Sequence, residues 1–88
     1  MASTTNPTIT TTWSAIVAVG SNFLLTLPFD TNYSIEVATT DSAVTGPTVR
    51  GHVLSGDQQE GLTRDLIGPG TVWARTLIGS AALVLNVW

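Results

Sequence analysis

The chain has 88 residues, no cysteine, one histidine and a net charge of −3, and only 10% of its residues are charged. A domain of this size buries only about 60–65% of the surface of its unfolded chain, so it often needs disulfides, a metal or oligomerisation as reinforcement. The composition argues against the first two, and the lack of a basic run argues against a nucleic-acid partner. We therefore expect one small domain that associates with itself.

The few cations in the chain support this expectation. Lysine is absent, and the three cations are Arg50, Arg64 and Arg75. Protein interfaces are enriched in arginine and aromatic residues and depleted in lysine, aspartate and glutamate. The alternative is an ordinary monomer kept in solution by its many serines and threonines.

The N-terminal sequence predicts neither a signal peptide nor a membrane anchor. It has no basic segment, and the apolar run 15–19 is too short to act as a signal core or to span a membrane. We therefore expect no membrane partner and synthesis in a cytosol-like compartment.

The first half of the chain reads as an extended segment followed by strands. Residues 1–8 are polar and contain Pro7, which favours an extended arm, either disordered or laid on a partner, outside a β domain that spans residues 9–88. Residues 9–19 predict a strand. By period-two counting, that strand has one face made of Trp13, Ala15, Val17 and Val19.

Two further strands are predicted before the middle of the chain. A turn at 20–22 leads into a short buried strand at 23–27, and 33–38 alternates between apolar and polar residues. The alternation places Tyr33, Ile35 and Val37 inward and Ser34 and Glu36 outward.

The second half predicts three or four more strands. Residues 48–54 form one, in which Gly51 indicates a bulge or a close approach of the backbone. Residues 62–67 fit either a short strand or a single helical turn, and 71–77 and 81–88 form a terminal pair. In the last strand, we expect Leu83, Leu85 and Val87 on the core face and Val84, Asn86 and Trp88 on the other.

Short strands separated by turn residues every eight to twelve positions are typical of antiparallel sandwiches and barrels. No segment has a helical stripe of apolar residues. The sequence therefore predicts an all-β fold, a small antiparallel β-sandwich or jelly-roll-like barrel of six or seven strands with an extended N-terminal arm.

The residues that carry enzyme and metal chemistry are sparse. His52 is the only histidine, and its surroundings lack the strand, turn and helix of a nucleophile elbow. The loop 55–61 with Asp65 offers carboxylates for calcium, but its spacing matches no EF-hand. We predict no catalytic, cofactor or metal site, and interpret this protein as a non-enzyme.

The last two strands carry aromatic and basic residues suited to contacts with a partner. Trp73 and Arg75 share one face of the strand 71–77 and fit either a partner pocket or, equally, a place in the core and at a strand edge. Trp88 is interpreted as core or as a seam between subunits, and Trp13 as core.

Part of the sequence resembles a known class of proteins. Residues 51–54 read Gly-His-Val-Leu, Arg64 follows, and 68–75 read Gly-Pro-Gly-Thr-Val-Trp-Ala-Arg before an apolar final strand. Over residues 46–88, this pattern resembles small β-structured virion proteins of tailed bacteriophages. The resemblance implies a structural component of a phage particle, often a homotrimer.

Three virion roles then compete. A capsid decoration (cement) protein binds the capsid surface and stabilises it, with the major capsid protein and its own copies as partners. The others are a tail-fibre or host-recognition knob that binds a surface glycan, and a neck or baseplate component. Since 88 residues hardly supply both the anchor and the tip of a fibre, we expect decoration. The candidate subunit or capsid interface residues are Arg50, His52, Arg64, Trp73, Arg75 and Trp88.

Overall fold

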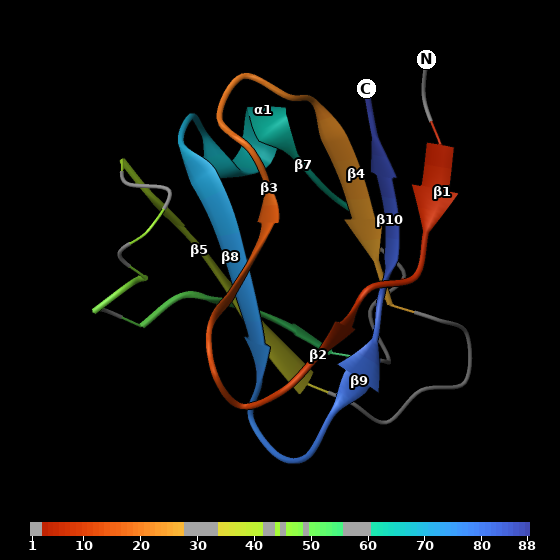
Figure 1. The fold of residues 1–88 in the computed structure, drawn as a ribbon, viewed down its shortest axis with the longest axis vertical. Helices are drawn as coiled ribbons and strands as arrows, with labels where there is room; N and C mark the ends of the chain where they lie inside the picture. Colours follow the sequence, from red (N-terminus) through yellow and green to blue (C-terminus); the bar gives the residue numbers. More distant parts are fainter. Residues whose placement is uncertain (1–2, 28–33, 42–43, 45, 49, 56–60) are drawn as a thin grey trace.

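A computed structural model of the chain describes residues 3–27, 34–41, 44, 46–48, 50–55 and 61–88, and within them the fold is all-β and antiparallel, as predicted (Figure 1). The described strands are β1 (Ser3–Thr5), β2 (Thr8–Ile9), β3 (Ser14–Val17), β4 (Phe23–Thr26), β5 (Ser34–Thr40), β6 (His52–Ser55), β7 (Leu62–Thr63), β8 (Thr71–Thr76), β9 (Ala81–Ala82) and β10 (Val84–Val87). The described residues contain one helical turn, α1 (Arg64–Ile67).

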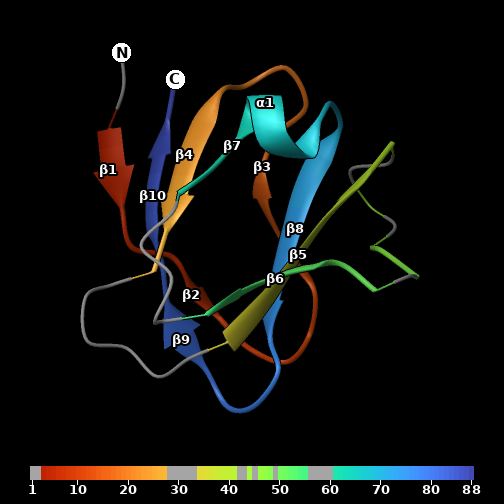
Figure 2. The ribbon, with the colours of Figure 1, turned by 180° about the vertical axis from the view of Figure 1, so that it is seen from behind.

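The strands form two four-stranded sheets that face each other. One sheet has the order β1-β10-β4-β7, the other has the order β3-β8-β5-β6, and β2 and β9 form a separate pair between them (Figures 1 and 2). Both sheets send apolar side chains into one core. The arrangement is sandwich-like, because each sheet is apolar on the face turned toward the other.

The core follows the predicted alternation in the strands that pair without irregularity. Ile35 and Val37 of β5 are fully buried, as are Leu25 of β4 and Leu83, which lies between β9 and β10. Leu85 is buried as well, and Val87 packs against the core while partly exposed. The predicted core face of the last strand is therefore confirmed.

The N-terminal segment differs from the prediction of an arm outside the domain. β1 pairs with β10 and β2 pairs with β9 in one continuous register, in which Pro7 lies opposite Leu83. Pro7 has no N–H to donate, and the Asn6 side chain donates to the Leu83 carbonyl at 3.0 Å in its place. The segment is extended, as expected, but from Ser3 onward it is an edge of the sandwich.

The strand count also differs, since ten short strands are described where six or seven were predicted. The predicted strand 9–19 divides into β2 and β3 as the chain passes from the small sheet to a large one. The register of β3 against β8 shifts between Ala15 and Val17, which places Ile16 in a bulge. The bulge puts Val17 in the core and leaves Ala15 exposed, so the predicted common face was wrong.

Residues 62–67 combine the two predicted alternatives. Leu62 and Thr63 pair with β4 as β7, and α1 follows directly (Figure 2). None of the helical structure in the described residues is long and apolar enough to cross a membrane.

Candidate functional site

The outer face of the sheet β3-β8-β5-β6 carries the main concentration of charge in the described residues. Because Ile35 and Val37 face the core, Glu36 lies on the opposite face, as predicted. Its side chain is nevertheless fully buried, which corrects the expectation that it meets solvent. The residues that cover it come from β8 and from the connection between β5 and β6.

Three groups donate hydrogen bonds to the Glu36 carboxylate. Arg75 donates from Nε and Nη2 to Oε1 at 3.1 and 2.9 Å, whereas Oε2 accepts from Arg50 Nε at 3.0 Å and from the Gly51 amide at 2.7 Å. The Arg75 guanidinium also lies over the Trp13 ring, 4.6 Å from its centroid. We call Glu36, Arg50, Gly51, Arg75 and Trp13 the ionic cluster.

These contacts keep Glu36 ionised. The amide of Gly51 contributes most to lowering the pKa of Glu36 from 4.5 to about 2, burial opposes this shift, and the hydrogen bonds from Arg75 and Arg50 add to it. A buried carboxylate with two cations and one amide around it is fully satisfied.

Gly51 is required at its position by the close approach of two backbones. A Cβ placed there would lie 2.5 Å from the Val37 carbonyl oxygen, a distance that real side chains do not reach. The glycine therefore lets the chain come near enough to β5 for its amide to reach Glu36. The predicted close approach of the backbone at Gly51 is confirmed, and it brings the Gly51 amide to the Glu36 carboxylate.

Trp73 lies beside the ionic cluster but is buried. Its ring contacts the position of Gly46, and its Nε1 donates to Thr40 Oγ1 at 2.7 Å. With 8% of its surface exposed, Trp73 packs within the chain, but on the outer face of the sheet rather than in the core cluster. Arg75 lies on β8, which has a neighbouring strand on both sides, and not at a strand edge. His52, in contrast, is exposed on β6, the edge strand of the same sheet.

Arg64 lies at the other end of the sandwich and is engaged entirely within the chain. Its Nε and Nη2 donate to the Ser21 carbonyl, Nη2 also donates to Ala18, and Nη1 donates to Gly68 and Gly70, at 2.7–3.1 Å. A guanidinium has five N–H donors, so none remains for a partner. Arg64 thus ties α1 to the β3–β4 connection rather than offering a charge to another subunit.

Three large apolar side chains are exposed near the residues that Arg64 holds together. Val19 is on the β3–β4 connection and 67% exposed, Leu66 is on α1 and 68% exposed, and Trp88 follows β10 and is 53% exposed. The backbone of Trp88 is held by two hydrogen bonds with Asn22, at 2.9 and 3.0 Å. Figure 1 shows the three segments at the same end of the molecule. We call Val19, Leu66 and Trp88 the apolar end.

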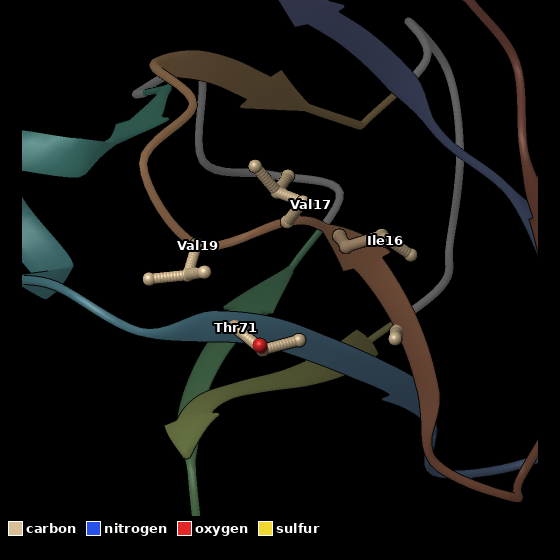
Figure 3. Close-up of a pocket in the computed structure, with 6 residues that line it drawn as sticks. Ile16, Val17, Val19 and Thr71 are labelled. Carbon is tan, nitrogen blue, oxygen red and sulfur yellow. The ribbon is translucent and has the colours of Figure 1, made fainter. Parts of the chain in front are cut away.

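Two open hollows border the apolar end. The larger has a volume of about 290 Å³ and is lined by Ala15, Ile16, Val17, Ala18, Val19 and Thr71. Figure 3 shows Val19 beside Thr71 of β8, with Ile16 and Val17 along β3. The smaller, of about 140 Å³, lies between α1 and the C-terminus and is lined by Asn22, Phe23, Thr63, Arg64, Asp65 and Trp88. The surface at this end is therefore both apolar and uneven.

The described residues contain no group of three histidine, cysteine, aspartate or glutamate side chains placed to hold a metal ion. Most of the loop considered for calcium, residues 56–60, lies outside the described part of the chain. No family model, characterised protein or solved structure matches this chain. A functional proposal therefore rests on the contacts and exposed surfaces of the chain itself.

The structure brings together only some of the predicted site residues. Arg50 and Arg75 meet on Glu36, and Arg64 and Trp88 line one hollow, whereas His52 joins neither group. Sequence reasoning missed Glu36 and Leu66. The sequence does indicate a special role for Glu36, because it is a lone glutamate inside a strand of apolar and small residues. No sequence pattern indicates the exposure of Leu66, because the helical turn that carries it is too short to show periodicity.

Proposed function

We propose that the chain is a non-enzymatic structural protein of a phage particle, and that it binds the capsid surface as a homotrimer that stabilises the shell. The observation that carries the proposal is the apolar end, where the exposed Val19, Leu66 and Trp88 come from segments at the same end of the molecule (Figure 1). Contiguous exposed apolar surface rimmed by polar residues is typical of interaction sites. The resemblance of residues 46–88 to phage virion proteins supports the choice of particle.

The proposed trimer uses the apolar end as the centre of the interface between copies of the chain. Tryptophan is enriched among the residues that dominate binding energy, and leucine and valine around it exclude water. Burying the exposed parts of these side chains removes apolar area from water at roughly 25 cal/mol per Å². For an 88-residue chain with a small core, this burial adds stability that the isolated domain lacks.

The glycan-binding alternative receives less support. In this role Trp73 or Tyr33 would stack on a sugar ring, but Trp73 is buried and its Nε1 donates to Thr40 Oγ1. Tyr33 lies outside the described residues. A neck or baseplate role places the same trimer against a different neighbour, and co-sedimentation with capsids separates it from decoration.

Co-sedimentation with capsids assembled without this chain tests the proposal. We expect the protein to pellet with the capsids at low micromolar concentration. The double variant Leu66→Ser, Trp88→Ser should bind at least tenfold more weakly, because a single chain lacks the combined contacts of a trimer. Ile78→Ser is the matched control, because Ile78 is 86% exposed on the β8–β9 connection at the opposite end (Figure 1). Failure of the unmodified protein to pellet would remove the capsid role.

A further inference from the structure

The ionic cluster has more positive than negative charge. Glu36 supplies one negative charge, and Arg50 and Arg75 supply two positive ones. The Glu36 side chain is fully buried, whereas 76% of the Arg50 side chain and 30% of the Arg75 side chain are exposed. A chain with a net charge of −3 therefore presents a local positive site on one face of a sheet.

The two guanidinium groups are held in place with donors to spare. Arg50 uses only Nε on Glu36, and Arg75 uses Nε and Nη2. Among the described residues, both terminal nitrogens of Arg50 and Nη1 of Arg75 have no hydrogen-bond partner. The Arg75 guanidinium also lies over the ring of Trp13. A ligand would meet an Arg75 guanidinium oriented by Glu36 and Trp13 and an Arg50 guanidinium anchored by one hydrogen bond, so it would lose less side-chain entropy than on two free arginines.

We propose that Arg50 and Arg75 form a binding site for a carboxylate on an acidic segment of a partner protein. The planar guanidinium donors match the two oxygens of a carboxylate. A polyanion such as a nucleic acid fits less well, because a single excess charge on an acidic chain offers few phosphate contacts and repels the rest.

A protein segment also fits the surroundings of the site. Arg50 lies two residues before β6, which is an edge strand of its sheet. Val53 of β6 lies opposite Glu36 in the register, and it is half exposed. An extended segment along this edge would bring its backbone to β6 and its acidic side chain to Arg50. This inference does not depend on the trimer or on the capsid role.

The test is a titration of the isotope-labelled full chain, followed by nuclear magnetic resonance, with end-capped hexaglutamate as the probe. We expect saturable shifts of the Arg50 and Arg75 Nε signals and of the Gly51 amide, with millimolar affinity that weakens as salt is added. Hexaglutamine should cause no such shifts. Absence of saturable shifts with hexaglutamate would overturn the proposal, as would equal shifts with hexaglutamine or with a hexanucleotide.

Variants separate the site from general charge effects. Arg50→Gln should weaken hexaglutamate binding at least tenfold, and Arg50→Lys should weaken it less, because lysine keeps the charge but loses the planar donors. Asn86→Asp is the matched control: it changes the net charge equally, in β10 of the other sheet, and should leave the affinity within twofold. Equal weakening by Arg50→Gln and Asn86→Asp would overturn the proposal.

Discussion

The ionic cluster and the apolar end differ in whether their side chains have partners within the chain. In the ionic cluster, a fully buried carboxylate is matched by hydrogen bonds from two arginines and a backbone amide. In the apolar end, three large side chains stay exposed, although Arg64 binds the carbonyls of Ala18 and Ser21 on either side of Val19 and Asn22 binds the backbone of Trp88. The Glu36 carboxylate is satisfied within the chain, whereas we propose that the apolar end is covered by other copies of the chain.

The contrast predicts that substitutions in the two regions separate stability from association. Changes to the ionic cluster should alter the free energy of unfolding, and changes to the apolar end should alter self-association. Substitutions in one region that changed both the free energy of unfolding and self-association would contradict this prediction.

The largest expected effect on stability comes from Glu36→Gln. Removing the charge that holds two arginines should lower the free energy of unfolding by about 3 kcal/mol. Denaturant unfolding followed by tryptophan fluorescence measures it. Asp65→Asn is the control, since Asp65 is exposed and forms no ion pair in the described structure, and it should change stability by less than about 0.5 kcal/mol. Equal effects of the two variants would contradict the structural role of Glu36.

Acid should weaken the same region next most strongly. The pKa of Glu36 is lowered from 4.5 to about 2, so its stabilising contribution is complete above the unfolded-state value and is lost as the pH falls through that interval. We expect a loss on the order of 2 kcal/mol between about pH 6 and about pH 3. Glu36→Gln should flatten this part of the stability profile, and parallel profiles for the two proteins would contradict the assignment.

A smaller effect is expected from Gly51→Ala. The added methyl group would meet the Val37 carbonyl and push the Gly51 amide away from Glu36, at a cost of about 1–2 kcal/mol. Gly46→Ala is the matched control on the same connection, where a Cβ would make only ordinary contacts with Trp13 and Trp73. If both variants unfold at the same denaturant concentration, the close approach at Gly51 has no energetic role.

The smallest effect on stability is expected from Leu66→Ser. Because Leu66 is exposed on a single helical turn, its replacement should change the free energy of unfolding by less than about 0.5 kcal/mol while weakening self-association. Light scattering over a dilution series checks the association, and denaturant unfolding checks the stability. A large loss of stability with unchanged association would place Leu66 in the fold rather than in an interface.

The alternation of apolar and polar residues predicted which side chains of the regular strands face the core. It failed where segments distant in the sequence determine the structure. Ile35, Val37 and Leu85 follow it within strands that pair without interruption, and Leu83 follows it in the continuous register between β9 and β10. The alternation also placed Glu36 on the correct face, but its burial depends on a connection that folds back over the sheet. The bulge at Ile16 likewise changed which side chains of β3 reach the core.

The pairing of the N-terminal segment was equally invisible in the local pattern. Ser3, Thr4 and Thr5 are exposed and polar, which favours an arm, yet the edge of β10 supplies backbone partners to them. Arg64 shows the same limit in the candidate site, because its carbonyl partners Ala18 and Ser21 lie more than forty residues away in the sequence. Non-local contacts of this kind leave no periodic signal in the sequence.

The mass of the protein in solution tests most directly the claim that the apolar end joins copies of the chain. Light scattering at low micromolar concentration should give three times the chain mass of 9.2 kDa, and the Leu66→Ser, Trp88→Ser variant should give a single chain. A stable monomer of the unmodified protein at this concentration, or a trimer that persists in the double variant, would contradict the claim.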